Sequence, residues 1–146
     1  MDGAGGVVTS PHNLEPIRDR YRSTYGSVPA GVEERLRVAG ALGRVTTEDT
    51  FANLRQVVLD ENPLGKRVQQ LVHFGQLLVL GRADAARLHA RGALHAGASL
   101  TDLAGVAETA LITCGAPAYA LGVEIVAELL PDSAQSPAST DATSVM

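Results

Sequence analysis

The feature that most constrains the fold is a core that must be built almost without aromatic side chains. Only 3% of the 146 residues are aromatic although 45% are hydrophobic, and the chain contains no tryptophan. Its apolar residues are mainly Ala, Leu and Val, and both Ala and Leu favour helices over strands. Apolar positions also recur at helical spacing between Leu14 and Leu130. The sequence therefore predicts an all-α fold of about six helices.

The two ends of the chain differ in composition from its middle. Residues 1–13 are rich in Gly, Ser and Pro, and residues 131–146 read PDSAQSPASTDATSVM. The second of these segments carries too little apolar surface to order itself. We therefore expect a flexible arm over 1–13, a single helical domain over 14–130 and a disordered tail over 131–146.

One helix in the middle of the chain is expected to be the most buried. It follows Pro63, which falls where a first-turn proline is tolerated, and its apolar residues continue on most of its faces as far as Leu80. Ahead of it, Thr46 or Thr47 is expected to cap another helix by accepting a hydrogen bond from the backbone.

Three further helices are expected after Gly81. The first covers residues 83–96, and the second begins at Ser99 and runs through about Cys114. Ser99 followed three residues later by Asp102 resembles a capping box with Asp in place of Glu. A break at Gly115 and Pro117 precedes the last helix, over about 118–130.

The charge distribution argues against a nucleic-acid partner. The net charge is −4, and every basic residue lies at or before Arg91. The residues after Arg91 include six acids and no lysine or arginine. No uncharged run is long enough to span a bilayer, and no secretory leader is apparent. We expect a cytoplasmic protein with neither nucleic acid nor membrane as a partner.

The single cysteine excludes several kinds of chemistry. Cys114 alone can form neither an internal disulfide nor a redox pair nor a cysteine-built zinc site. We expect it to be buried and inert. The histidines lack the one-turn spacing of a helical metal site, so no metal is expected.

His89 lies among small residues. Ala85, Ala86, Gly92 and Ala93 fall within one or two turns of it on one side of a predicted helix. Small side chains let a neighbouring helix approach closely, which would hold the imidazole in a narrow, partly dry seam. An imidazole exchanges its proton near neutral pH and suits general acid–base catalysis. The alternative is a core histidine bonded to a carbonyl group, and both interpretations remain open.

A second polar position lies on the preceding helix. Gln70 and His73 are three residues apart, about one turn, and so point to a similar side. They form either a polar notch in an apolar helix or an edge that faces solvent or another subunit. His95 is six residues beyond His89, and we expect it at the surface.

Residues 64–130 contain the segments LGKRVQQLV, LHARGALHAGASLTDLAGV and TCGAPAYALGVEIVAEL. Through these segments the chain resembles the carboxymuconolactone decarboxylase and alkylhydroperoxidase D superfamily. The resemblance implies an all-helical subunit whose site lies between helices, often near a subunit interface. It also implies a homo-oligomer, commonly a trimer or a hexamer built from trimers.

The departures from the family pattern restrict the activity. At the positions of the peroxidase glutamate, cysteine pair and histidine, this chain has Gln70, Arg82, Ala85 and His89. Only the histidine remains, so the dithiol peroxidase cycle is excluded. Decarboxylase members resemble the chain at His89, but their glutamate matches Ala85 and their tyrosine matches Thr113. We therefore do not expect carboxymuconolactone itself to be the substrate.

The expected function is proton transfer next to a carbonyl group, without a cofactor. Decarboxylation, dehydration, isomerisation and conjugate-addition ring closure all pass through an enolate-like species and need a base and an enolate donor. We expect His89 to be the base, with Gln70 as the donor and His73 beside them. The residues expected to bind a small carbonyl or carboxylate substrate are Thr109, Thr113, Glu108 and Arg82.

Two further considerations bear on this expectation. Arginine replaces almost all lysine, which suggests a GC-rich bacterial genome, and members of this superfamily there sometimes tailor natural products such as polyketides. The alternative is a non-catalytic oligomeric ligand-binding or scaffold protein that kept the fold. Loss of the family's glutamate, tyrosine and cysteines favours that alternative, whereas the retained His89 favours an enzyme.

Overall fold

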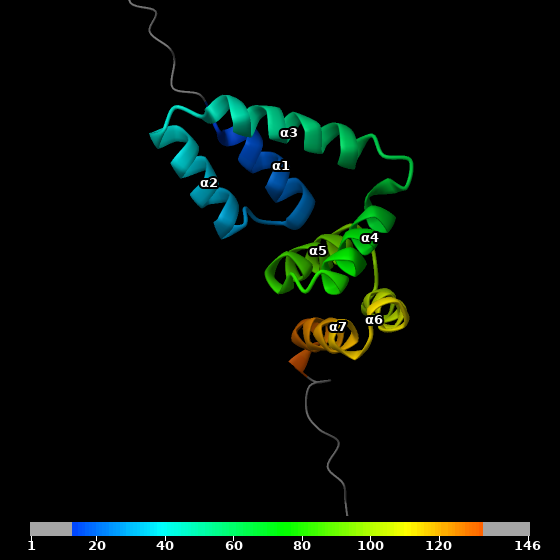
Figure 1. Cartoon of the computed structure of the whole chain (residues 1–146). Coiled ribbons are helices and arrows are strands. Elements are labelled where there is room, and N and C mark those ends of the chain that lie inside the picture. Colours follow the sequence, from blue (N-terminus) through cyan, green and yellow to red (C-terminus); the bar gives the residue numbers. More distant parts are fainter. Residues whose placement is uncertain (1–12, 133–146) are drawn as a thin grey trace, which may run out of the picture. The chain divides into compact units, whose positions relative to one another are not determined.

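The computed structural model describes residues 13–132, which form seven α-helices and no strand (Figure 1). The all-α class is confirmed, with seven helices in this range rather than about six. Five of the six connections between consecutive helices contain a glycine with positive φ, which stops one helix before the next begins, and Gly65 with positive φ is the first residue of the fourth helix. The expected arm and tail lie almost entirely outside the described residues, and the single domain over 14–130 stays a prediction.

The described chain divides into two compact units, with the boundary after Lys66. Unit 1, residues 13–66, contains α1 (Glu15–Tyr25), α2 (Ala30–Ala41) and α3 (Val45–Asp60). Its buried apolar side chains come from all three helices: Ile17, Tyr21, Tyr25, Val32, Leu36, Ala39, Val45 and Ala52.

The start of α3 differs from the expected cap. The helix begins at Val45 after Arg44, and no side chain caps it. The preceding turn contains Gly43, whose φ is +65°, and the backbone N–H of Thr47 already donates to the carbonyl of Arg44. Thr46 and Thr47 therefore lie inside the first turn.

Unit 2, residues 67–132, is a bundle of four helices. They are α4 (Gly65–Val79, which begins two residues before the boundary), α5 (Ala83–His95), α6 (Leu100–Cys114) and α7 (Ala116–Leu129). One continuous core joins them, with Phe74, Leu78, Leu103 and Ile125 as its large members and alanines between them. The core alanines are Ala86, Ala90, Ala93, Ala98, Ala107, Ala110 and Ala118.

The expectation that α4 would be the most buried helix is wrong for half of its surface. Phe74 and Leu78 are fully buried, but Val68 and Val72 are about 40% exposed. Leu80, expected within the helix, follows its last residue and is 68% exposed. Pro63 likewise precedes the helix, which begins at Gly65. An apolar sequence cannot show which faces find a partner within the same chain.

The capping box at the start of α6 is confirmed. Ser99 Oγ accepts from the backbone N–H of Asp102 at 3.0 Å, and the Asp102 carboxylate accepts from the N–H of Ser99 at 2.8 Å. Arg67 of α4 also donates to Asp102 at 2.6 Å. The backbone hydrogen bond from Ser99, followed by that from Arg67, lowers the pKa of Asp102. The cap thus joins α4 to the start of α6.

The break between the last two helices is sharper than expected. Gly115 alone separates α6 from α7, with φ at +94°. Pro117 lies in the first turn of α7, so it starts the helix instead of interrupting it. The last helix therefore begins at Ala116, about two residues before the expected start.

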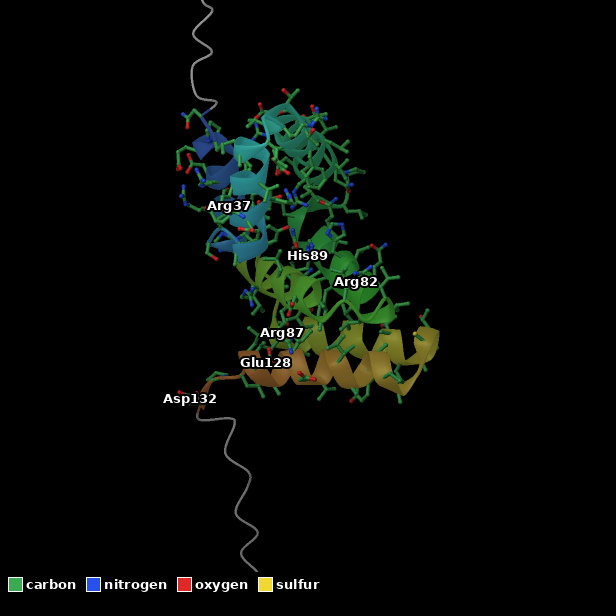
Figure 2. The ribbon with its side chains drawn as sticks, turned by 60° about the vertical axis from the view of Figure 1, so that its left-hand side comes forward. Arg37, Arg82, Arg87, His89, Glu128 and Asp132 are labelled. Carbon is green, nitrogen blue, oxygen red and sulfur yellow. The ribbon has the colours of Figure 1, made fainter. Side chains whose placement is uncertain are left out.

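An ion-pair cluster fixes α5 against α7 within unit 2 (Figure 2). Arg87 Nε lies 2.9 Å from Glu128 Oε2, and Arg87 Nη2 lies 2.8 Å from Glu124 Oε1. The Arg87 guanidinium lowers the pKa of Glu128, mainly through this hydrogen bond. His89 is two residues beyond Arg87, so these contacts help to set the position of the helix that carries it.

None of the helices between residues 13 and 132 combines the length and hydropathy needed to cross a bilayer.

Candidate functional site

His89 is held by a helix that is anchored on its alanine face. Ala86, Ala90 and Ala93 of α5 have no exposed surface, whereas the His89 side chain is half-buried. These three alanines belong to the core of unit 2, so this face of α5 packs against the bundle. The predicted environment of small residues around His89 is therefore present.

Gln70 of α4 makes the shortest contact to the imidazole. Its Oε1 lies 2.8 Å from His89 Nδ1, and the Gln70 side chain is only 3% exposed. An amide oxygen accepts hydrogen bonds and cannot donate them, so this bond requires a proton on His89 Nδ1. The neutral ring then carries its lone pair on Nε2. The buried amide thus selects the tautomer in which Nε2 is the basic atom.

His73, one turn after Gln70 on α4, contacts the same nitrogen. Its Nδ1 lies 3.2 Å from His89 Nδ1, and the two rings are nearly perpendicular with centroids 4.5 Å apart. If His89 Nδ1 carries the proton, His73 Nδ1 accepts a share of it and its own proton lies on Nε2. The His73 contact is therefore compatible with the tautomer of His89 that Gln70 requires.

This arrangement favours placing a proton on His89. A protonated His89 keeps its Nδ1–H directed at two neutral acceptors, Gln70 Oε1 and His73 Nδ1. A protonated His73 would instead direct an N–H at the N–H of His89. Two imidazoles at this distance also disfavour a second positive charge. The cluster can therefore take up and release one proton at His89 Nε2.

The four residues expected to bind substrate do not join this cluster. Among the described residues we find no hydrogen bond or ion pair between His89 and any of them. Thr109 and Thr113 donate to carbonyl groups of their own helix, at 2.9 Å and 3.3 Å. Glu108 on α6 and Arg82 at the start of α5 are exposed. His95 is exposed, as expected.

Thr109 and Thr113 instead line a groove between α4 and α6, with a volume of about 680 Å³. We call it the α4–α6 groove. Gly75 lies in it, and a Cβ atom there would be 3.0 Å from Val106 Cγ1, so the two helices approach closely. The groove was not predicted from the sequence, although the apolar residues on most faces of α4 indicate such a surface. Its other apolar residues are Val68, Leu71, Val72, Val79, Leu80 and Ala110.

The expected burial of Cys114 is wrong. The residue is exposed, and its Sγ lies 3.7 Å from the carbonyl oxygen of Val79. It is the last residue of α6. Within residues 13–132, no three His, Cys, Asp or Glu side chains gather closely enough to hold a metal ion.

Residues 46–128 match the sequence model of the carboxymuconolactone decarboxylase family. The match covers more than half of the chain, which therefore belongs to this family. It includes the whole of α4, α5 and α6 and thus Gln70, His73 and His89, whereas α1 and α2 precede it. No curated protein and no solved structure matches the chain significantly.

Proposed function

We propose that the protein is a cofactor-independent acid–base enzyme that acts next to a carbonyl group of a small organic molecule. The observation that carries this proposal is the 2.8 Å contact between His89 Nδ1 and the buried amide oxygen of Gln70. When the Nδ1 proton is held in this way, the neutral ring presents the lone pair of Nε2 to a reactant. That is what a general base requires.

The proposed reaction moves one proton and one electron pair. His89 Nε2 takes the proton from a carbon beside the carbonyl group, and the electrons of the C–H bond move into an enolate. In decarboxylation the carbon–carboxylate bond breaks instead, carbon dioxide leaves, and protonated His89 returns a proton to the carbanion carbon. Dehydration, isomerisation and conjugate-addition ring closure use the same exchange, and a polyketide-type molecule is a suitable substrate.

The geometry changes the role proposed for Gln70. Its amide oxygen accepts from His89 Nδ1, so Gln70 acts as a positioning residue in place of the enolate donor expected from the sequence. The contact of His73 with His89 Nδ1 is compatible with the same tautomer. Thr109, Thr113, Glu108 and Arg82 keep a proposed role in substrate binding only if the substrate extends along α6 and the start of α5.

A non-catalytic ligand-binding or scaffold protein is the second candidate. Two observations favour it: the α4–α6 groove exposes an apolar surface, and His89 does not line that groove. A scaffold would conserve the fold without turnover, so the two candidates differ in whether any substrate is converted.

The experiment that separates them needs no known substrate. Purified protein in EDTA is incubated in deuterium oxide with a panel of β-keto acids and enolisable lactones, and NMR follows carbon dioxide loss and deuterium incorporation. An enzyme is expected to accelerate the reaction of at least one compound, with a rate that saturates as the concentration of that compound rises. If every compound in a broad panel reacts at the buffer rate while it still binds the protein, the scaffold is the correct assignment.

The single cysteine leads to a prediction about redox chemistry. Cys114→Ser should retain the activity found in that screen nearly unchanged, because a thiol cycle needs a thiolate and a resolving thiol. Thiol-dependent peroxide reduction should be absent from both forms. A large loss of activity in a Cys114→Ser protein with unchanged circular dichroism would contradict the non-redox assignment.

A homo-oligomer is the second prediction. Leu80 is 68% exposed and Ile112 is 87% exposed, and exposed apolar surface of this kind marks interaction sites. A second copy is the expected occupant, as the family resemblance implies, in a trimer or a hexamer of trimers. Light scattering of Cys114→Ser protein, which cannot cross-link, should give at least twice the 15.2 kDa of one chain. A monomer at micromolar concentration would contradict this.

A further inference from the structure

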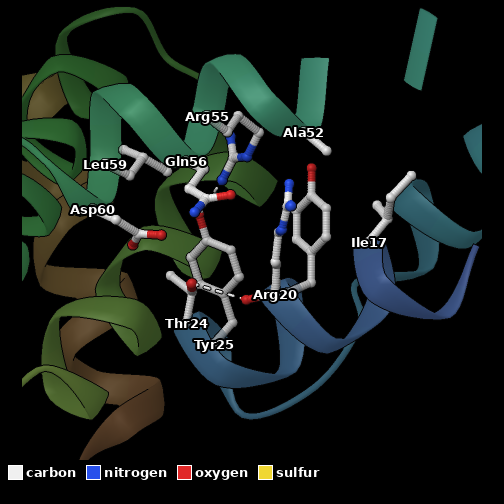
Figure 3. Close-up of a pocket in the computed structure, with 10 residues that line it drawn as sticks. Ile17, Arg20, Thr24, Tyr25, Ala52, Arg55, Gln56, Leu59 and Asp60 are labelled. Carbon is white, nitrogen blue, oxygen red and sulfur yellow. Dashed lines mark hydrogen bonds between the residues drawn. The ribbon is translucent and has the colours of Figure 1, made fainter. Parts of the chain in front are cut away.

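Unit 1 contains a hollow between α1 and α3 in which two arginines lack a carboxylate partner (Figure 3). The residues that line it include Arg20, Tyr25 and Arg55, with Gln56 and Asp60 at the end of α3. Among the described residues, Arg20 and Arg55 form no ion pair. Four other arginines of unit 1 pair with acids: Arg18, Arg22, Arg35 and Arg37.

Aromatic groups hold the Arg55 guanidinium in place. Its Nη2 donates to the Tyr25 hydroxyl at 2.8 Å, and its Cζ lies 5.1 Å from the centre of the Tyr21 ring. Arg35 also contacts an aromatic ring, but the buried Glu48 carboxylate binds it through two nitrogens, at 3.1 Å and 2.9 Å. A guanidinium has five N–H donors, and Arg55 uses one of them here. A half-buried cation fixed in this way is ready to accept an anion.

The size and lining of the hollow restrict which anion fits. Its interior has about 30 Å³ of space for small molecules, and a cavity needs about 10–15 Å³ of such space to hold one water. The enclosed part has room for the two oxygens of a carboxylate, which a planar guanidinium can bind through both. A carbon chain would lie in the part of the hollow that opens to solvent. Ile17, Ala52 and Leu59 supply apolar walls for a short carbon chain.

A doubly charged anion fits less well. Asp60 also lines the hollow, and its charge is only partly offset by Lys66, whose Nζ lies 3.3 Å from Oδ1. A single negative charge satisfies Arg20 and Arg55 while limiting repulsion from Asp60. We propose that unit 1 binds a small monocarboxylate, with its carboxylate on Arg55 and Arg20 and its carbon chain against Ile17, Ala52 and Leu59.

The test follows tyrosine emission and requires no turnover. The chain has no tryptophan and three tyrosines, so full-length Tyr119→Phe protein reports only on Tyr21 and Tyr25 in unit 1. Sodium propionate is titrated at constant ionic strength, with sodium chloride and sodium phosphate as the comparison anions. We expect a saturable change with propionate and a dissociation constant on the order of 1 mM, as suits a ligand of so few atoms.

Variants identify the residues responsible. Arg55→Lys keeps the charge but loses the planar pair of donors, and it should weaken propionate binding at least tenfold. Arg20→Gln should weaken it several-fold. Arg44→Gln is the matched control, because Arg44 also forms no ion pair among the described residues but lines a different hollow, beside Glu34 and Glu48. Its propionate affinity should equal that of the parent.

Three results would overturn the proposal: a change that sodium chloride reproduces, tighter binding of phosphate than of propionate, or equal effects of Arg20→Gln and Arg44→Gln. Circular dichroism checks that Arg55→Lys is folded. If it is not, the comparison of Arg20→Gln with Arg44→Gln decides, since both side chains are exposed.

Discussion

Replacing His89 with alanine is expected to lower turnover by about 10²–10⁴, the usual cost of removing a general acid–base group. The measurement is the rate of carbon dioxide loss or deuterium incorporation with the compound that the screen identifies. The loss should appear in kcat, because the proton transfer itself slows.

His95→Ala is the matched control, since His95 lies on the same helix and is exposed. It should retain the parent rate. If His95→Ala loses turnover and a folded His89→Ala protein does not, the site has been assigned to the wrong face of α5.

Changes at Gln70 should separate a positioning role from a purely structural one. Gln70→Leu keeps a similar volume but removes the acceptor for His89 Nδ1–H, and we expect a loss of about 10–100-fold, the size of the effect seen for groups that orient metal-binding histidines. Gln70→Glu restores an acceptor and should recover most of the rate. Equal rates in both variants would contradict the positioning role.

The second large effect concerns stability. Gly122→Ala in α7 is expected to destabilise the protein by about 1–3 kcal/mol, because overpacking forces neighbouring helices apart. A Cβ atom at Gly122 would lie 2.5 Å from Ala107 Cβ and 3.3 Å from Ala107 Cα in α6. The Ala107 side chain cannot move aside, so α7 must shift. Urea unfolding at one protein concentration measures the change.

Gly105→Ala in α6 is the control for this substitution. A Cβ atom at Gly105 would meet nothing within 4 Å, and the residue is exposed. The same change should therefore stabilise the protein by about 0.5–1 kcal/mol through the lower entropy of the unfolded chain. Destabilisation by both variants would show that the α6–α7 approach is not the cause.

The sequence predicts the parts of this structure that depend on neighbours along the chain. The capping box at Ser99 is set within a few residues and lies where expected. The ends of α4 and α5 fall within about one residue of the expected positions. The position of Gln70 and His73 on the same side of α4 follows from helical spacing alone. The absence of a cap at Thr46 was not predictable in the same way, because the turn at Gly43 decides it.

Long-range packing accounts for what the sequence did not predict. The meeting of His73 with His89, sixteen residues apart, depends on how α4 lies against α5. The exposure of Cys114 and of one face of α4 likewise depends on which surfaces the other helices cover. The sequence does not distinguish an apolar residue that packs inside the chain from one that packs against another molecule.

The most direct test of the central claim is the tautomer of His89, read from long-range ¹H–¹⁵N spectra of the imidazole rings, with His89→Gln protein used for assignment. In the neutral ring, His89 Nδ1 should have the signal of a protonated nitrogen and Nε2 that of an unprotonated one, and Gln70→Leu should reduce this preference. A neutral His89 with its proton on Nε2 would leave no lone pair there to act as a base, and it would contradict the account.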